Sequence, residues 1–331
     1  MNNDRKMLYQ NKMANYAIGI SAALFATGVW SLNFIIPFVI GRYSIFDFAL
    51  FRFVISGCVG AIVLVLRRDR IYRMGIKDMA VIAWLSLTGY VGFFLLVSSS
   101  AMLAGPVIAP AILSLVPVVL SISGNLYQGS VAWRSFFIPL FFIATGLIVL
   151  NGYDYTMHRG YQLLPPYMGM LCAMGAVILW TCFGLFNQNA LENRPTMDSS
   201  VWSAMLLVAS AVEIVLFFPI GSSMGLFEIP TLGLSWSSAH SLWLWGVSLA
   251  FLSSVGGVWA WTIASRRLPV ALSAQLVVFE TIFGICFGLI TQSRLPSFID
   301  IGGIVLLIVG VVMATRVFYM SHSYTQIKHV E

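Results

Sequence analysis

Apolar residues come in long runs along this chain, and short polar or charged segments separate the runs. A helix needs about 20 mostly apolar residues to cross the hydrocarbon core of a bilayer. Windows of that kind predict ten membrane-spanning helices. Strands are not expected, because lipid offers no hydrogen-bond partner to an open sheet edge. The predicted spans are 14–38, 46–66, 79–98, 105–124, 136–152, 166–186, 200–220, 241–263, 270–291 and 300–319.

Composition strengthens this interpretation. The 331 residues are 59% hydrophobic and only 9% charged, and the mean hydropathy is +0.90. Soluble domains carry about 25% charged residues, and a soluble fold of this length could not bury so much apolar surface. The expected fold class is therefore an all-α polytopic membrane protein with ten transmembrane helices.

Motifs and charge placement exclude several other classes. The net charge of +6 comes from basic residues in short segments between apolar runs, so no nucleic-acid partner is expected. The four cysteines lie inside apolar runs without C-x-x-C spacing, which predicts neither a metal site nor a disulfide framework. The sequence has no P-loop, no H-E-x-x-H and no G-x-S-x-G motif. We therefore expect no enzyme activity and no cofactor.

Lys and Arg are distributed unevenly between the two predicted sides of the membrane. With the N-terminus inside, the inner segments hold 14 of the 18 basic residues and the outer segments hold three. Positive charge in short loops marks the cytoplasmic side. The bias predicts that residues 1–13 and 320–331 are cytoplasmic tails. The first apolar run exceeds the length of a signal peptide, so we expect an uncleaved first helix.

The two halves of the chain show an internal repeat. Aligned pairs are Gly19 with Gly169, Ala26 with Ala176 and Trp30 with Trp180 at an offset of 150, and Gly92 with Gly256, Gly124 with Gly288 and Gly146 with Gly310 at an offset of 164. The predicted repeats cover residues 14–152 and 166–319, with five helices each. An odd number of helices makes the second repeat enter the membrane from the opposite side, which is the inverted arrangement of many secondary transporters.

Short motifs along residues 14–319 resemble the drug/metabolite transporter superfamily, and specifically its EamA-type branch. Trp30-Ser31-Leu32-Asn33-Phe34 is similar to the family's W-G-x-N-F, and Ala49-Leu50-Phe51-Arg52-Phe53 is similar to its A-L-R-F. The family's Glu-Pro motif is split here, with Pro117 in the first half and Glu280 in the second. Its Gly-Glu motif is absent from Gly129-Ser130 and Ser293-Arg294. The resemblance implies a ten-helix metabolite exporter of the bacterial inner membrane.

Glu280 is the ionisable residue of the apolar stretch from Leu268 to Gln292. A charge near the bilayer centre costs roughly 2.5–3.5 kcal/mol on insertion scales. A helix that served only as a membrane anchor would therefore be expected to carry an apolar residue at this position. One interpretation is a site for a substrate cation or a coupling proton in a central cavity. The other is a carboxylate hydrogen-bonded to backbone at a break in the ninth helix.

Arg52 lies in the outer part of the second span. Its guanidinium suits a bidentate contact with a substrate carboxylate. Alternatively, it pairs with Asp47 or with Glu213 of the seventh span and holds helices together. We favour the structural ion pair.

Aromatic and amide side chains supply further candidates for substrate binding. Trp30 and Asn33 lie within one turn of the first span, and Trp180 holds the position equivalent to Trp30. An indole can stack on an aromatic or cationic substrate, and an amide can bind a polar head group. Trp259 and Trp261 point to opposite faces of one helix, so at most one lines a cavity. We take Trp259 as the candidate, against the alternative that these rings only pack or face lipid.

Small residues and prolines suggest how the helices pack and move. Pro106, Pro110 and Pro117 lie in the fourth span, where proline kinks a helix and allows a hinge. Gly284 with Gly288, and Gly303 with Gly310, permit close helix packing, either within the bundle or in a homodimer.

These observations predict a secondary transporter that moves a small organic metabolite by alternating access. By resemblance the substrate is an amino acid or a related amphipathic or cationic compound, and export is the expected direction. A proton gradient acting through Glu280, or the substrate's own gradient, would supply the energy. Two alternatives stay open: an uncoupled facilitator or channel, and a non-transporting scaffold or lipid-handling enzyme.

Overall fold

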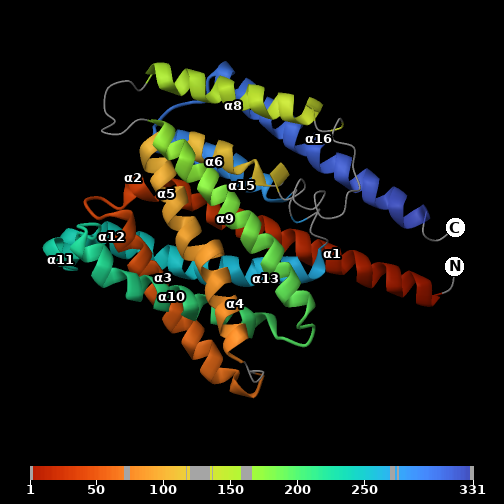
Figure 1. The fold of residues 1–331 in the computed structure, drawn as a ribbon, viewed down its shortest axis with the longest axis horizontal. Coiled ribbons are helices and arrows are strands. Elements are labelled where there is room, and N and C mark those ends of the chain that lie inside the picture. The colour runs from red at the N-terminus through yellow and green to blue at the C-terminus, as the bar shows by residue number, and fades with distance from the viewer. Residues whose placement is uncertain are drawn as a thin grey trace.

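The computed structural model describes residues 3–70, 75–116, 118, 119, 135, 137–157, 166–268, 273 and 276–328. Every regular element within these ranges is a helix, and no strand occurs among them. The all-α class expected from the apolar runs is thereby confirmed. Figure 1 shows the helices crossing one another in a single bundle.

The helices follow one another with short connections. Up to residue 157 they are α1 (Asn3–Trp30), η1 (Ser31–Ile35), α2 (Ile36–Val39), α3 (Ile45–Leu66), η2 (Arg68–Arg70), α4 (Ile76–Ser86), η3 (Leu87–Val91), α5 (Gly92–Ala104), α6 (Ile108–Leu113) and α8 (Phe137–Met157). After residue 165 they are α9 (Pro166–Glu192), α10 (Ser199–Ser223), α11 (Ile229–Leu232), α12 (Trp236–Leu249), η5 (Ala250–Gly257), α13 (Val258–Arg267), α15 (Val278–Thr291) and α16 (Phe298–Lys328).

Six continuous helical segments of the described chain are long and apolar enough to cross a membrane. They are Ala14–Val39, Ile45–Leu66, Ile76–Ala104, Tyr167–Glu192, Ser199–Ser223 and Trp236–Arg267. Shorter apolar stretches occur at Phe137–Gly146, Val278–Thr291 and Phe298–Met313. The predicted span 105–124 is described only in part, and within it α6 is short. Six segments of the described residues are thus candidate spans by length and composition, and the count of ten stays a prediction.

Polar side chains mark where two of the long helices begin. The Ser44 hydroxyl accepts a hydrogen bond from the Asp47 amide at 3.1 Å, and the Asp47 carboxylate accepts one from the Ser44 amide at 2.9 Å. This reciprocal pair satisfies amides that the first turn of α3 leaves unpaired. Asp198 does the same for α10 by accepting from the amides of Ser200 and Val201. The caps fix the register of two helices that pack along each other.

Irregular helical geometry interrupts three of the apolar segments. A 3₁₀ turn, η1, follows α1, while π segments η3 and η5 lie inside the segments Ile76–Ala104 and Trp236–Arg267. A π turn widens the helix by one residue and often marks a functional position. All three segments carry buried residues, so they belong to the interior of the bundle.

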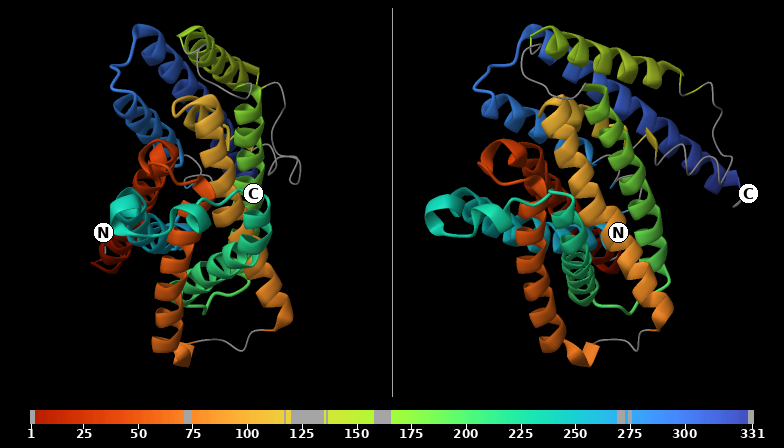
Figure 2. Two further views of the ribbon diagram at one scale, coloured as in Figure 1. Left: turned by 90° about the vertical axis from the view of Figure 1, so that its left-hand side faces the viewer. Right: turned by 60° about the vertical axis from the view of Figure 1, so that its left-hand side comes forward.

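Helices α8 and α16 run side by side along one edge of the molecule, and both views of Figure 2 keep them together there. The glycines permit this close approach. A Cβ placed on Gly310 would lie 2.8 Å from the Ile143 nitrogen and 2.8 Å from the Pro139 oxygen. Gly146 lies equally close to the backbone of α16. Gly284 and Gly288 of α15 lie against Phe34, Pro110 and Pro106. These glycines therefore serve contacts inside the bundle.

The α8–α16 contact predicts unequal costs for two glycine substitutions in one helix. Gly310→Ala should lower the free energy of unfolding by about 1–3 kcal/mol, because backbone atoms of α8 occupy the space that the methyl group needs. Gly302→Ala, with nothing within 4 Å of the added Cβ, should be neutral or stabilise by up to about 1 kcal/mol. Unfolding of the purified variants in detergent measures both. Equal effects would contradict the packing described here.

Candidate functional site

Arg52 lies at the meeting point of three elements inside the bundle. From α3, its Nε donates to the Ser254 hydroxyl at 2.7 Å and its Nη2 donates to the Ser253 hydroxyl at 2.9 Å. Its Nη1 donates to the Asn33 side-chain oxygen at 2.6 Å. We call these four residues the Arg52 centre. Arg52 is 3% exposed, and its charge is held by neutral oxygens of η1 and η5.

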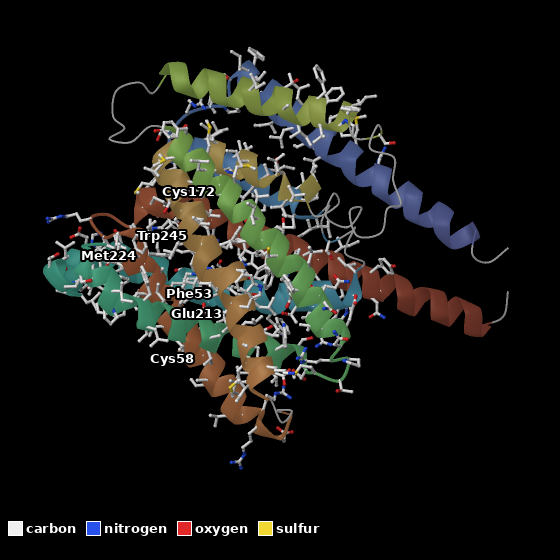
Figure 3. The ribbon with its side chains drawn as sticks, in the orientation of Figure 1. Phe53, Cys58, Cys172, Glu213, Met224 and Trp245 are labelled. Carbon is white, nitrogen blue, oxygen red and sulfur yellow. The ribbon has the colours of Figure 1, made fainter. Side chains whose placement is uncertain are left out.

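The ion pair expected for Arg52 does not form. No carboxylate of the described residues lies within salt-bridge distance of its guanidinium. Asp47 instead caps α3 and accepts hydrogen bonds from the backbone amides of Glu228 and Ile229 at 3.0 Å. Glu213, which Figure 3 labels on α10, accepts from the Ser86 hydroxyl at 3.1 Å. The prediction failed because backbone amides and a hydroxyl, rather than Arg52, are the nearest donors to these carboxylates.

Three buried indole rings form a cluster directly beside the Arg52 centre. The ring centroid of Trp30 lies 5.2 Å from that of Trp180 and 5.4 Å from that of Trp261, and the last two lie 5.9 Å apart. The Trp30 indole donates to the Ser253 carbonyl at 3.0 Å. Ser253 therefore joins this tryptophan cluster to the Arg52 centre, through its carbonyl on one side and its hydroxyl on the other.

Trp259 does not belong to this cluster. It is 50% exposed, whereas Trp261 is 8% exposed and contacts both other indoles. Two residues along a helix turn the side chain by roughly 200°, so only one of the two rings can face the interior. The sequence showed that the two rings face opposite ways, but it could not show which face points inward. Trp261 takes the place predicted for Trp259.

Glu280 is buried in the first turn of α15. The apolar stretch places it near the middle of a span, but α15 begins only at Val278. A carboxylate near a helix N-terminus interacts favourably with the helix dipole. α15 packs against η1 and α6, with Gly284 against the Phe34 ring one turn beyond Glu280. The element that carries Glu280 thus adjoins the segment that carries Asn33.

The proline-rich segment is broken rather than kinked. Pro106 lies in the turn between α5 and α6, just after Gly105, whose φ of 95° ends α5. Pro110 is the third residue of α6, where a helix amide needs no partner within the helix. Pro117 lies outside the described residues. Neither described proline interrupts a continuous helix, so the hinge expected there has no kink to support it.

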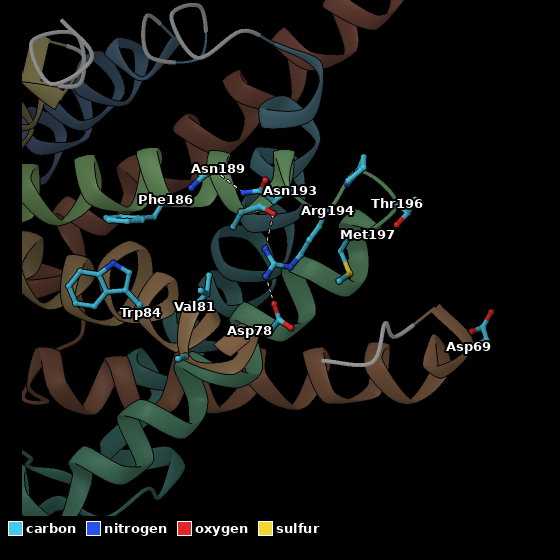
Figure 4. A pocket seen from close by; sticks show the side chains of 13 residues that line it. Asp69, Asp78, Val81, Trp84, Phe186, Asn189, Asn193, Arg194, Thr196 and Met197 are labelled. Atoms are coloured by element: carbon cyan, nitrogen blue, oxygen red, sulfur yellow. Dashed lines mark hydrogen bonds and ion pairs between the residues drawn. The ribbon is translucent and has the colours of Figure 1, made fainter. Parts of the chain in front are cut away.

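A second polar region lies at the start of α4, around Asp78, and the sequence did not predict it. Arg194 contacts Asp78 of α4, and its Nη1 donates to the Ala190 carbonyl at 3.0 Å. Both side chains line a groove of about 880 Å³ between α4 and α9 (Figure 4). In the sequence Arg194 counted only as a loop charge. A pairing across 116 residues leaves no local pattern that could have revealed it.

Most of the chain is similar in sequence to a known membrane protein. It is 25% identical over 310 residues to the inner membrane protein YtfF of Escherichia coli (strain K12), across 90% of this chain and 95% of that protein. A solved structure described only as "Crystal structure of protein" superposes with a TM-score of 0.61 at 19% identity, covering 91% of this chain and 98% of that one. No protein-family model matches the chain.

The tryptophan cluster predicts different costs for two substitutions in α13. Trp261→Ala should lower the free energy of unfolding by about 3–5 kcal/mol, because it leaves a cavity between two buried indoles. Trp259→Ala removes a half-exposed ring and should cost less than about 1 kcal/mol. Thermal unfolding of the two purified variants compares them directly. A larger loss for Trp259→Ala would overturn the assignment of Trp261 to the interior.

Proposed function

We propose that this chain is a secondary transporter that moves a small organic metabolite across the inner membrane. The observation that carries the proposal is the buried Arg52 centre next to the tryptophan cluster. It combines a charge, neutral polar groups and aromatic faces inside a bundle of apolar helices. Charged and polar groups at such depth are costly and usually mark a substrate or ion pathway. The similarity to the inner membrane protein YtfF supports the inner-membrane location.

We propose further that the molecule consists of two inverted five-helix repeats, residues 14–152 and 166–319. The two π segments support this, because an offset of 164 carries Leu87–Val91 onto residues 251–255, inside Ala250–Gly257. The contact between α8 and α16 also repeats at the offset of 164, with Gly146 and Gly310 as equivalent residues. A Cβ on Gly146 would lie 2.8 Å from the Gly303 oxygen and 2.9 Å from the Leu307 nitrogen, and these are the counterparts of Pro139 and Ile143 that face Gly310.

Contacts between helices also follow the pattern that two repeats related by a pseudo-twofold axis would produce. Helix α1 packs along η5 and α13, while α9, its counterpart, packs along η3 and α5. Counterparts also pack on each other: α3 on α10, α6 on α15 and α8 on α16. The motifs around Trp30 and Arg52 support placement in the drug/metabolite transporter superfamily, in its EamA-type branch. Both termini are then cytoplasmic.

The substrate would bind near the Arg52 centre, where elements of both repeats meet. Asn33 and Arg52 come from the first repeat, and Ser253, Ser254 and Trp180 come from the second. Rocking of one repeat against the other would expose this region to each side in turn. Trp30, Trp180 and Trp261 offer faces for an aromatic or cationic group. Glu280, in the helix that adjoins η1, is the candidate for proton coupling during export.

Reconstitution tests the transport proposal. Liposomes containing the purified protein are loaded with a mixed metabolite extract, and efflux is followed by mass spectrometry with and without a pH gradient. Selective loss of a few compounds is the expected result, and dependence on the gradient would indicate proton coupling. Gradient-independent loss would identify a facilitator or channel. If no compound leaves faster than from protein-free liposomes, a non-transporting scaffold or lipid-handling enzyme becomes the better explanation.

Substitution of the buried carboxylate tests its proposed role in coupling. Glu280→Gln should reduce gradient-driven flux by about tenfold or more, the scale set by losing an interaction with a charged group. The variant should remain folded in the membrane, because glutamine keeps the shape of the side chain. Glu228→Gln, at an exposed carboxylate, is the matched control and should transport normally. Unchanged flux in Glu280→Gln would remove the residue from the mechanism.

A further inference from the structure

The groove between α4 and α9 lies where two membrane-length segments reach the same surface. Ile76–Ala104 begins there and Tyr167–Glu192 ends there. These segments run in opposite directions through the bundle, so residues early in α4 and late in α9 share one depth. The groove holds about 880 Å³, a volume within the range of small-molecule sites, roughly 300–1,000 Å³. It lies outside the Arg52 centre, since the two share no residue.

The lining of the groove changes from apolar to polar along its length (Figure 4). Trp84 and Phe186 lie toward the bundle, and both rings are about half exposed, at 46% and 52%. Asn193 and Arg194 lie just past the end of α9, and Asp78 lies in the first turn of α4. Aromatic rings at head-group level next to polar groups are typical of the membrane interface. The change from apolar to polar lining therefore matches a ligand with an apolar part and a polar head.

The groove is lined by charges of both signs, and two of them, Arg194 and Asp78, are paired with each other. Asp78 and the Ala190 carbonyl hold the Arg194 guanidinium, which also lies 5.9 Å from the centroid of the Trp202 ring. Asp69 contributes a second carboxylate to the lining. Arginine is well suited to phosphate, and carboxylates are suited to an ammonium group. A head group with one phosphate and one ammonium complements the Arg194–Asp78 pair, whereas a purely anionic head would leave the Asp78 carboxylate without a cation from the ligand.

We propose that the groove binds a phospholipid with a phosphate–ammonium head group, of the phosphatidylethanolamine class. The phosphate lies near Arg194, the primary ammonium near the Asp78 carboxylate, and an acyl chain along Trp84 and Phe186. The bound lipid bridges α4 and α9, which come from the first and the second half of the chain. This site requires only that the chain sits in a membrane, so it is independent of whether the chain transports a solute.

Native mass spectrometry of the delipidated, full-length protein tests the proposal. The probes are phosphatidylethanolamine, phosphatidylcholine and phosphatidylglycerol with identical acyl chains, added from detergent solution. The expected result is a one-to-one adduct with phosphatidylethanolamine that forms at about fivefold lower concentration than with the other two, the scale of one charged contact at a membrane surface. Trp84→Ala should weaken binding of all three lipids, because it removes apolar contact area.

Asn193→Glu provides the sharper variant, since Asn193 is exposed and its side chain donates to Asn189 rather than to the Arg194–Asp78 pair. The added carboxylate should repel the lipid phosphate and abolish the preference for phosphatidylethanolamine. Ser237→Glu, at an exposed position in the first turn of α12, is the matched control and should bind as the unaltered protein does. Equal adducts with all three lipids, stronger binding of phosphatidylglycerol, or an unaltered preference in Asn193→Glu would each overturn the proposal.

Discussion

Backbone hydrogen bonding inside lipid is the constraint on which this structure depends. A peptide group in the hydrocarbon has no water to bind, so the chain must satisfy each one internally. The long segments do so as regular helices, and the departures from regularity occur at segments that carry buried residues. η1 and η3 are largely buried, and half of η5 is buried, while Phe251 and Leu252 of η5 are exposed. Aromatic rings of other helices pack on η3 and η5. Gly89 lies against the Phe183 ring and Gly257 against the Trp30 ring.

These irregular segments also create the polar interior. Ser253 and Ser254 lie in η5 and Asn33 lies in η1, so the acceptors for Arg52 come from the two places where helix geometry changes. A buried guanidinium surrounded by hydroxyl and amide oxygens is hydrogen-bonded but not neutralised. In a low-dielectric interior such a charge attracts a mobile anion or an anionic part of a substrate more strongly than it would in water. An internal carboxylate partner would have removed that attraction.

The apolar runs were sufficient to predict the all-α class and the positions of the six long spans, because length and hydropathy are local properties. They also singled out Trp30, Asn33 and Trp180 as candidates, and the structure buries all three, but the sequence did not predict that the two indoles touch each other. The partners of Arg52 were not predictable, since Ser253 and Ser254 are about 200 residues away and small hydroxyl residues are common in membrane helices. Likewise, the choice between Trp259 and Trp261 depends on helix rotation, which packing decides. The contact of Arg194 with Asp78 gave no signal, because each is an ordinary loop-flanking charge in the sequence.

The seam between α8 and α16 has a mechanical consequence. Each helix belongs to a different half of the chain, and their glycines bring the two backbones into direct contact. The halves also come this close at other helix pairs. A Cβ on Gly60 of α3 would lie 2.8 Å from the Ala204 oxygen of α10, and one on Gly169 of α9 would lie 2.6 Å from the Ala104 nitrogen of α5. Such contacts leave little room for a lateral shift, because a shift drives peptide atoms into one another. The glycine contacts therefore tie the two halves of the chain together at several helix pairs, and α8 with α16 is the pair at the edge of the molecule.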